Sequence, residues 1–549
     1  MPLQKNQVLT LQVERLSSDG SGVAHSPEGE TVFIPGAAPG DEARVRIVKD
    51  CKRYAFGILD EVLTPSPDRI PVDCAVAGPC GGCSLRHLDY AAELRAKQEN
   101  VADAFARIGG LDVPVLPIVG SPEIDRYRNK VQFPVGTDKA GRPCIGFYAG
   151  RTHRIVPCPD CRLQPGVLNE IGNTLCAFFA EKGIHPYNEE TGKGLVRHIF
   201  LRRGAHSGQI MVCLVCTRAK IPSADELCTR LKEAFPDIVT ILLNVNAKNT
   251  NVILGSETHT LYGQGYIEDT LCGVPVQLGP LSFYQVNTLA AEQLYGIAAE
   301  YAQLTPDDLL LDLYCGMGTI GLSMADHCRE LVGVEIVPEA IESAKANAAR
   351  MGAAVSSKSR FFCADAGQAA AQLAAEGLHP DVVMLDPPRK GCDEATLSAV
   401  VRMAPRRVVY VSCNPATAAR DAAWLEQNGY HAEKVQPVDL FPRTKHCETV
   451  CLLSKLHAKQ HIEIDLSMDE LDLTAAESKA TYDEIKAYVL EKYGLKVSSL
   501  YISQVKRKCG LDVGQNYNLP KKEDAKVPQC PPEKEAAIIE ALKHFQMIS

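Results

Sequence analysis

The chain has 549 residues, which is too long for one ordinary hydrophobic core and suggests roughly three or four domains. Its formal net charge of −9 argues against a uniformly basic nucleic-acid-binding protein, although a local basic face is compatible with it. Because there is no membrane-spanning apolar run, no signal-peptide core at residues 1–11 and an odd number of scattered cysteines (21), we expect a cytoplasmic protein without membrane association, whose cysteines are free thiols or metal ligands.

Apolar and polar positions alternate from about residue 7 to residue 63, with breaks at 18–22, 27–29 and 35–40. Regular short strands separated by such turns predict a five-stranded, OB-like β-barrel in residues 1–64. Barrels of this kind often bind single-stranded nucleic acid through basic and aromatic side chains. The candidates are Arg44, Arg46, Lys49, Lys52, Arg53 and Tyr54. The alternative is a solvated charged face without a ligand.

A proline-rich connector at 64–71 leads to Cys74, Cys80 and Cys83, which have the spacing Cys-x5-Cys-x2-Cys. Three clustered thiolates need a fourth ligand to complete a tetrahedral zinc site or a cuboidal iron–sulfur site. Cys158 and Cys161, in the segment IVPCPDC, are both candidates, and the spacing does not choose between them. Both metals accept four cysteines, so the residues alone leave zinc and an iron–sulfur cluster open.

A central α+β domain is expected at 65–281, with strands and a few helices between about 114 and 280. Two basic clusters fall in strand-like runs, the first with Arg126, Arg128 and Lys130, and the second with Arg197, His198, Arg202 and Arg203. We interpret them as one RNA-facing sheet, in which cationic side chains contact phosphates without reading the sequence. Ordinary surface charge is the alternative.

Residues 282–456 alternate strand-like runs, such as LLLDLY and RVVYVSCNP, with helix-like runs, such as PEAIESAKANAARMG. This alternation predicts a doubly wound, Rossmann-like parallel sheet, which binds ligands beyond the carboxyl ends of its strands. The first turn, DLYCGMG, lacks the third glycine of the dinucleotide fingerprint, and no phosphate-binding lysine follows. Together with Glu335 and Asp365 at the next two strand ends, the turn favours S-adenosylmethionine, which has a ribose but no phosphate.

Two later strands end on Asp386 and Cys413, in DVVMLDPPR and VVYVSCNP. Polar residues at several neighbouring strand ends suggest a shared pocket, although a single cysteine is more often an inert small hydrophobe. Six segments, SFYQVN, DLYCGMGTIGL, VGVE, LDPPRKG, VSCNP and FPRTKHCETV, together resemble the RNA (uracil-5-)-methyltransferases, which make 5-methyluridine in ribosomal and transfer RNA. The resemblance covers roughly residues 7–456.

The resemblance implies a TRAM barrel, a [4Fe–4S] cluster and an S-adenosylmethionine-dependent methyltransferase domain at 282–456. The implied cluster ligands are Cys74, Cys80, Cys83 and Cys161, which leaves Cys158 as a bystander. The implied cofactor residues are Gln285, Tyr314, Thr319, Glu335, Asp365 and Asp386. The family often has Asn where this chain has Thr319, which is a shorter polar group.

The chemistry explains why this family needs a thiol and a carboxylate. Uracil C5 is a poor nucleophile, but addition of a thiolate at C6 converts the ring into an enolate that can attack a sulfonium methyl group. We expect Cys413 to be the nucleophile. Glu448 is the expected general base that removes the C5 proton, a role worth roughly 10² to 10⁴ in rate. Asp386 could orient either the uracil edge or the cofactor.

We expect an RNA substrate whose target uridine is unpaired or flipped out, and no obligate protein partner. The cluster and the TRAM barrel together favour 23S ribosomal RNA, with transfer RNA as the alternative. A non-catalytic RNA-binding iron–sulfur protein is a further alternative, but the joint presence of Cys413 and Glu448 argues against it. Residues 457–549 read as an acidic linker at 462–477 and a small helical extension, with helices at 482–494 and near 533–545.

Overall fold

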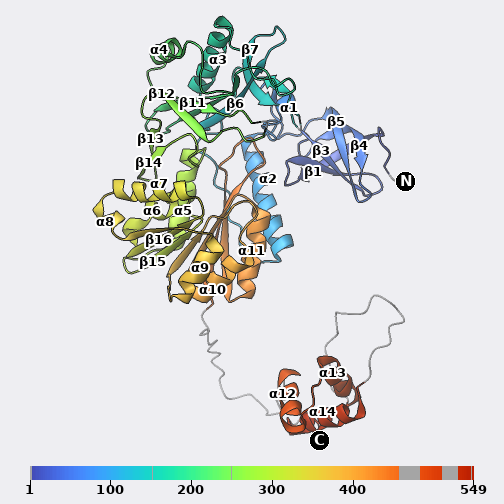
Figure 1. The fold of residues 1–549 in the computed structure, drawn as a ribbon. Helices are drawn as coiled ribbons and strands as arrows, with labels where there is room; N and C mark the ends of the chain where they lie inside the picture. Colours follow the sequence, from blue (N-terminus) through green and yellow to red (C-terminus); the bar gives the residue numbers. More distant parts are fainter. Residues whose placement is uncertain are drawn as a thin grey trace. The chain divides into compact units, whose positions relative to one another are not determined.

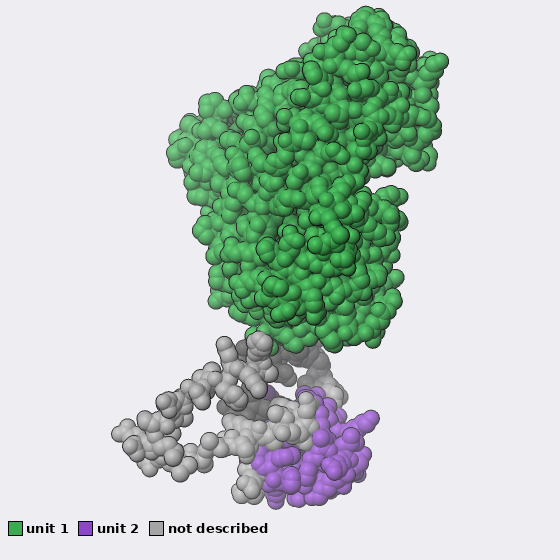
Figure 2. All heavy atoms as spheres, turned by 90° about the vertical axis from the view of Figure 1, so that its left-hand side faces the viewer, with its two compact units in different colours: residues 1–458 green, residues 459–549 purple. Residues whose placement is uncertain are grey.

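The computed structural model describes residues 3–150, 152–248, 250–456, 482–509, 530–545 and 547–548. The chain divides into two units, residues 1–458 and residues 459–549 (Figure 2). In the described ranges no helix combines the length and the apolar character that crossing a membrane requires. The acidic segment predicted at 462–477 lies outside the described residues.

Five strands near the N-terminus close into a barrel in the order β1-β2-β3-β5-β4 (Figure 1). They are β1 (Val8–Leu16), β2 (Ser21–His25), β3 (Thr31–Pro35), β4 (Glu42–Asp50) and β5 (Tyr54–Thr64). Because successive side chains of a strand point to opposite faces, alternate apolar residues such as Val32, Ile34 and Val45 fill the interior. The predicted five-stranded barrel is confirmed.

The segment after the barrel contains α1 (Ala77–Cys80), α2 (Tyr90–Asp103) and the π-helix η1 (Ala104–Gly109). Asp89 caps α2 by accepting a hydrogen bond from the amide of Ala92 at 2.9 Å. Val101 and Phe105 are buried in the same hydrophobic core as strands of the 282–456 region. The helix α2 therefore packs against the sheet of the 282–456 region, although it lies within the range expected for the central domain.

A seven-stranded mixed sheet follows, in the order β12-β11-β10-β9-β6-β7-β8. Its strands are β6 (Lys130–Thr137), β7 (Pro143–Tyr148), β8 (Ile155–Pro157), β9 (Val196–Arg203), β10 (Ile210–Cys216), β11 (Ile238–Val245) and β12 (Glu257–Tyr262), accompanied by α3 (Gly166–Glu181), α4 (Ala224–Ala234) and the hairpin of β13 (Ile267–Leu271) and β14 (Val274–Leu278). Strands β9 and β10 are buried along almost their whole length, so both of their faces are covered.

A second seven-stranded sheet has the order β17-β16-β15-β18-β19-β21-β20. Its strands are β15 (Leu309–Leu313), β16 (Glu330–Glu335), β17 (Ser359–Cys363), β18 (Val382–Leu385), β19 (Arg407–Ser412), β20 (Tyr430–Val438) and β21 (Glu448–Lys455). The helical elements are α5 (Thr288–Ala302), α6 (Thr319–Ser323), η2 (Ala325–His327), α7 (Pro338–Arg350), α8 (Ala353–Ser356), α9 (Ala366–Ala375), α10 (Glu394–Met403) and α11 (Pro415–Gln427). Strands β15 to β19 are parallel, as predicted, whereas β21 is antiparallel to both of its neighbours. The strand order reverses between β15 and β18, which is where such sheets bind ligands.

The second unit contains three described helices, α12 (Tyr482–Tyr493), α13 (Ser499–Lys508) and α14 (Pro532–His544). They share a small apolar core in which Ile485, Ile502 and Ile538 are fully buried. The two helices predicted from the sequence are confirmed, and the segment 499–508 between them is a third helix.

Candidate active site

The carboxyl ends of four parallel strands bring their polar residues to one edge of the second sheet. Tyr314 follows β15, Glu335 ends β16, Asp386 follows β18 and Cys413 follows β19. Because parallel strands end at the same edge, these residues lie along one rim, around the point where the strand order reverses. The strand order therefore brings the residues expected to share a pocket to one edge of the sheet.

Glu448 reaches the same edge from the opposite chain direction. It is the first residue of β21, which runs antiparallel to β19, and the register pairs Ser412 with Thr449. The start of β21 therefore lies beside the end of β19, and Glu448 lies beside Cys413. The charges of Glu448 and Asp386 both act on the Cys413 thiol, so the three groups form one cluster.

Burial and neighbouring charges raise the pKa values of the three groups in this cluster. Burial and, to a smaller extent, the charge of Asp386 raise the pKa of Glu448 to about 8, while Arg389 opposes the shift. Burial also raises the pKa of Asp386 to about 7. The pKa of the Cys413 thiol is raised, first by burial and then by Glu448, while the positive charge and a hydrogen bond of Arg389 oppose the shift. The site thus holds two carboxyl groups that titrate near neutral pH, as acid–base chemistry requires.

Arg389 is a site residue that the sequence analysis did not assign, although it lies in the LDPPRKG motif directly after Asp386-Pro387-Pro388. Asn414 connects it to the loop that carries Cys413, because its Nδ2 donates to the carbonyl of Arg389 at 3.0 Å. Asn414 also caps α11 through its Oδ1, which accepts from the amide of Ala416 at 3.2 Å. The Nη2 of Arg389 lies 3.4 Å from Nδ1 of His446. One cation therefore contacts the loops that carry the thiol and the carboxylate.

The glycine turn after β15 is stabilised by Glu335, the residue that we expect to bind the ribose. Gly316 and Gly318 have left-handed φ values of 55° and 79°. At Gly318 a β-carbon would lie 3.1 Å from the Cβ of Ala344, so glycine lets α7 pack against the turn. Glu335 accepts a hydrogen bond from the amide of Gly316 at 3.1 Å, which joins the ends of β15 and β16.

Gln285 and Thr319 meet at a buried tyrosine. The hydroxyl of Tyr295, in α5, lies 3.3 Å from Oγ1 of Thr319 and also forms a hydrogen bond with the Gln285 side chain. The segment that carries Gln285 is fixed by Asn129, whose Nδ2 donates to the carbonyl of Gln285 at 2.7 Å. The sequence pattern marks Tyr295 only as a core position of a helix, so its polar role was not predicted.

The surroundings of the turn fit a ligand with polar and apolar parts. Asp312 is buried, and its Oδ1 has no hydrogen-bond partner within the described part of the chain. Burial and the charges of Asp386 and Glu335 raise the pKa of Asp312 to about 8, against a hydrogen bond from the amide of Gly321 that lowers it. Large apolar side chains are exposed at the ends of β16 and β17, namely Ile336, Val337 and Phe362. An unpaired buried acceptor beside apolar walls fits S-adenosylmethionine, which has an ammonium group, a ribose and a purine.

The two remaining predicted cofactor residues have local partners. Asp365 caps α9 by accepting hydrogen bonds from the amides of Gly367 and Gln368 at 3.1 and 3.2 Å. The hydroxyl of Tyr314 lies 3.3 Å from Oγ1 of Thr396. Four of the six predicted cofactor residues thus lie at or just after strand ends of this sheet, whereas Thr319 begins α6 and Gln285 lies just before α5.

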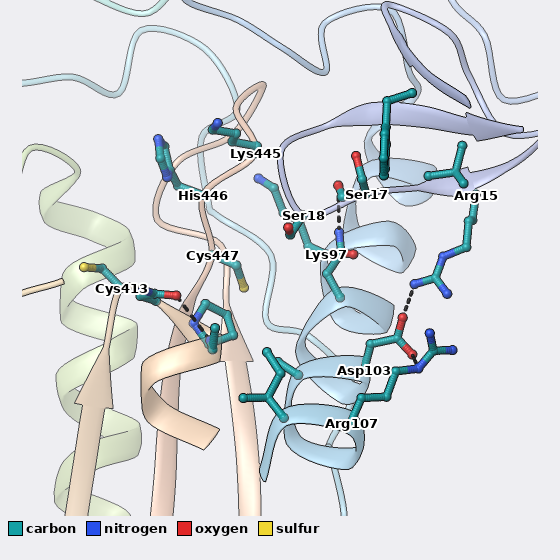
Figure 3. A pocket seen from close by; sticks show the side chains of 18 of the residues that line it. Arg15, Ser17, Ser18, Lys97, Asp103, Arg107, Cys413, Lys445, His446 and Cys447 are labelled. Carbon is teal, nitrogen blue, oxygen red and sulfur yellow. Dashed lines mark hydrogen bonds and ion pairs between the residues drawn. The ribbon is translucent and has the colours of Figure 1, made fainter. Parts of the chain in front are cut away.

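A cavity of about 670 Å³ opens in front of Cys413 (Figure 3). Its walls come from the barrel, from α2 and η1, and from the loops that carry Cys413 and His446. Figure 3 shows Arg15 of the barrel and Arg107 of η1 on either side of Asp103, to which both are ion-paired. Lys445 and His446 face the cavity from the opposite side. The cavity is therefore lined by cations and leads to the thiol, whereas the six predicted cofactor residues lie outside its lining.

The prediction that the second basic cluster faces RNA is wrong for Arg197, His198 and Arg202. Arg197, His198 and Arg202 are buried, with 5%, 5% and 1% of their surfaces exposed. Arg197 donates to the carbonyl of Lys248 at 2.6 Å, and Arg202 donates to that of Ser282 at 2.7 Å. Because both faces of β9 are covered, these cations satisfy backbone carbonyls instead of facing solvent.

The barrel contributes a different face from the predicted one. Residues of β1, β2 and β3 line the cavity, including Arg15, His25 and Phe33. None of the six predicted barrel residues lines it, and Arg44 and Arg46 are ion-paired with carboxylates of β5 at 2.6 Å. Strand alternation places these arginines on the outside of the barrel, so the sequence could not tell which outer face meets the rest of the protein.

The four cysteines predicted as cluster ligands come together. The pKa of Cys80 is raised by burial and by the proximity of Cys161 and Cys74. Burial raises the pKa of Cys83 to about 11, with Cys161 and Cys80 adding to the shift and a hydrogen bond from Arg86 opposing it. No three His, Cys, Asp or Glu side chains in the described ranges converge as ligands of one metal ion. The thiols interact without surrounding a single point.

Cys158 and Cys161 share a hydrogen bond between their side chains. This contact lowers the pKa of Cys161 and raises the pKa of Cys158. Cys158 is buried, whereas Cys161 is half-buried. Cys158, for which the sequence predicted no role, therefore contacts one of the predicted cluster ligands.

Comparisons with known proteins agree with this geometry. Residues 277–456 match the family model described as tRNA (Uracil-5-)-methyltransferase, and residues 2–59 match the TRAM domain. A protein of Halalkalibacterium halodurans named as an uncharacterized RNA methyltransferase is 43% identical over 453 residues, which cover 82% of this chain and 98% of that protein. The chain belongs to the tRNA (uracil-5-)-methyltransferase family. A Bacillus cereus RNA methyltransferase is 41% identical over 456 residues, covering 83% of this chain and 98% of its own length.

This uracil-5-methyltransferase family member also resembles a solved structure along most of its length. The Pyrococcus abyssi tRNA (uracil-54, C5)-methyltransferase, in complex with S-adenosyl-L-homocysteine, superposes with a TM-score of 0.65 at 27% identity. The match covers 81% of this chain and 100% of that one. The protein is thus an S-adenosylmethionine-dependent RNA methyltransferase with an N-terminal TRAM domain.

Proposed function

We propose that this protein methylates C5 of a uridine in 23S ribosomal RNA, with Cys413 as the nucleophile and Glu448 as the general base. The observation that carries the proposal is the register of β19 and β21, which sets a thiol beside a buried carboxylate at the edge where the parallel strands end. A thiol and a carboxylate close to one another are what addition to C6 and proton removal from C5 require.

In the proposed reaction the Cys413 sulfur adds to C6 of uracil, and Arg389 favours the thiolate that does so. Bound S-adenosylmethionine supplies an electrophilic methyl group for C5. Glu448 then removes the C5 proton, the electron pair of that C–H bond re-forms the C5–C6 double bond, and the C6–S bond breaks. The net change replaces one hydrogen of uracil by a methyl group and returns Cys413 as a thiolate. Asp386, with its pKa of about 7, can donate a hydrogen bond to a uracil carbonyl when protonated.

The residues proposed to hold S-adenosylmethionine are those that surround the glycine turn. Glu335 is placed for the ribose hydroxyls, and Asp365, Tyr314, Gln285 and Thr319 contribute the remaining polar contacts. The unpaired Oδ1 of buried Asp312 supports a cationic or hydrogen-bond-donating ligand at this point. We place Asp386 at the boundary between the cofactor and the uracil, because its charge acts on both Asp312 and Glu448.

We further propose that Cys74, Cys80, Cys83 and Cys161 hold a [4Fe–4S] cluster. The thiols influence one another but do not converge on one point, which suits a cuboidal cluster better than a single zinc ion, because each thiolate of the cluster binds a different iron atom. Methyl transfer needs no electrons from such a cluster, so its proposed part is to hold the segment 74–88 in place. An activity that followed the oxidation state of the cluster, with the fold intact, would contradict this part.

Transfer RNA is the second candidate substrate, and a specific observation favours it. The archaeal structure that superposes on 81% of this chain is a transfer RNA methyltransferase. The combination of a TRAM barrel with a cysteine cluster supports ribosomal RNA instead. In either RNA the target uridine has to leave its stack to reach Cys413.

The test compares 5-methyluridine across total RNA from cells that express the protein, lack it, or express a Cys413→Ala variant. We expect one or more sites in 23S ribosomal RNA to lose the modification in the second and third strains. Loss of the modification from transfer RNA alone would replace the proposed substrate by the second candidate. Undiminished 5-methyluridine with Cys413→Ala would overturn the mechanism.

A further inference from the structure

The loop at 439–447 connects β20 to β21 and ends directly before Glu448. Its backbone is held from outside at several points. Asn287 donates to the carbonyl of Leu440 at 3.0 Å, and the hydroxyl of Tyr127 donates to the carbonyl of Pro442 at 3.0 Å. The position of Glu448 therefore depends on what holds this loop as well as on its own strand.

The strongest of these contacts is a buried group of charges between the loop and α2. The Nζ of Lys97 donates to Oε1 of Glu93 and to Oδ1 of Asp439, both at 2.7 Å, and to the carbonyl of Phe441 at 3.2 Å. Lys97 has 2% of its side chain exposed, and both carboxylates have 0% exposed. Figure 3 shows Lys97 extending from α2 beside the loop that carries Lys445, His446 and Cys447.

Each carboxylate of this group also binds the loop or its support. Oε1 of Glu93 accepts a hydrogen bond from the amide of Arg443 at 2.7 Å. Oδ2 of Asp439 accepts from the hydroxyl of Tyr90 at 2.9 Å. Arg443 has a left-handed φ of 67°, a conformation that side chains rarely adopt without support from their surroundings. The charged group thus fixes both the start of the loop and its turn.

The same turn is attached to the cysteine segment. The amide of Leu85 donates to the carbonyl of Arg443 at 3.1 Å, and Arg443 donates to the carbonyl of Leu88 at 2.9 Å. Leu85 lies two residues after Cys83, so a short stretch of chain connects the cysteines to the loop before Glu448.

We infer that the buried group of Lys97, Glu93 and Asp439 is a positioning device for the catalytic base: it locks the loop at 439–447 onto α2 and thereby sets the distance between Glu448 and the uracil bound to Cys413. The inference rests on the proposed function of Glu448. It assigns positioning roles to three residues that touch neither of the proposed reacting groups.

Stability alone is a weak explanation for this group. Removing three charged groups from water is costly, and apolar residues of similar volume often stabilise a protein as much or more. What a buried ion pair can provide is one fixed geometry, because its partners have few alternative arrangements. A displacement of the base by about 1 Å can cost about 10²-fold in rate, so a fixed geometry at this point has a direct catalytic value.

The experiment uses two variants of the full chain, Lys97→Met and the charge-matched Lys97→Met/Glu93→Gln, with Arg95→Met as the control. Arg95 lies on the same helix but forms an exposed ion pair with Asp68. The double variant removes one positive and one negative buried charge, so it is expected to fold even if the single variant does not. Thermal unfolding establishes the folded fraction of each.

Two rates are then compared for each folded variant. Turnover on ordinary RNA requires proton removal by Glu448, whereas trapping of a covalent complex on RNA that contains 5-fluorouridine does not, because fluorine cannot leave C5 as a cation. We expect turnover to fall roughly 10- to 100-fold, with methylated covalent complex accumulating on ordinary RNA. Trapping on 5-fluorouridine RNA should change less than about threefold, and Arg95→Met should alter neither rate.

Two results would overturn the inference. Equal losses in turnover and trapping would mean that the group supports the whole site, and no loss in either would mean that the loop does not depend on it. The wild-type protein tests the proposed function separately, since a wild type that traps no 5-fluorouridine RNA would refute the role of Cys413 itself.

Discussion

Replacing Glu448 by glutamine should separate the two halves of the proposed reaction. Glutamine has nearly the same shape as glutamate, so Cys413 can still add to the ring and C5 can still be methylated. The amide cannot take the C5 proton, and the C6–S bond then has no route to break. The variant should therefore accumulate a covalent complex between the protein and methylated RNA.

The size of the effect follows from the burial of the side chain. A positioned general base contributes roughly 10² to 10⁴ in rate. Glu448 is 6% exposed, so water has little access to replace it, and we expect a loss in the upper part of that range. With a pKa of about 8, about one-tenth of the wild-type groups are ionised at pH 7, so proton removal in the wild type should become about tenfold faster between pH 7 and pH 9.

The same substitution should stabilise the fold. The pKa of Glu448 is about 8 in the folded protein against a model value of 4.5, so the folded state binds the proton more tightly than the unfolded state does. Stability is therefore lost as the pH rises from 4.5 to 8, and the loss at pH 7 is about 3 kcal/mol. Glutamine stays neutral, so the variant should gain up to this amount at pH 7 and nothing below pH 4.5.

The assay combines a denaturing gel, which reports covalent complex, with thermal unfolding at several pH values. Glu433→Gln is the matched control, because Glu433 is an exposed carboxylate on the neighbouring strand β20 and should change neither measurement. The reasoning is refuted if turnover is lost without accumulation of the complex. It is also refuted if Glu448→Gln unfolds at a lower temperature than the wild type at pH 7, since burial of the charge would then not be what raises the pKa.

Three other predictions concern the remaining site residues. Arg389→Gln removes the cation that opposes the raised pKa of the Cys413 thiol, so methylation at pH 7 should fall about tenfold, and an unchanged rate of methylation would contradict this. Cys161→Ser should lose bound iron and acid-labile sulfide while Cys158→Ser retains them, as measured on anaerobically purified protein, and equal iron contents would contradict the ligand choice. Tyr295→Phe removes the hydroxyl between Gln285 and Thr319, so the KM for S-adenosylmethionine should rise about three- to tenfold with little change in kcat, whereas an unchanged KM would separate Tyr295 from the cofactor site.

Much of the fold was accessible from the sequence because its periodicities are strong. The alternation at 7–63 gave the barrel, and the repeated strand and helix runs at 282–456 gave the parallel sheet. The positions of Glu335, Asp386 and Cys413 followed from a general rule, since the carboxyl ends of parallel strands share one edge. Glu448 did not follow from that rule. It begins an antiparallel strand, and only its resemblance to a family motif marked it.

Some side chains have burial and contacts that a local sequence pattern cannot predict. The run that includes Arg197 and Arg202 looks like a charged surface strand, but burial of both faces of β9 turns its cations toward backbone carbonyls. Lys97 received no role from the sequence, because its partner Asp439 lies in a distant part of the chain. Such pairings depend on tertiary packing, and no window of sequence around either residue reveals them.

The register of β19 and β21 also has a consequence for synthesis of the protein on the ribosome. The proposed nucleophile and the whole parallel part of the sheet emerge first, and the proposed proton acceptor follows only with the closing hairpin at 430–455. A nascent chain that ends before this hairpin lacks β21 and leaves the edge of β19, next to Cys413, without its partner strand. Both groups of the proposed mechanism are therefore in place only after the hairpin has been synthesised and has paired with β19.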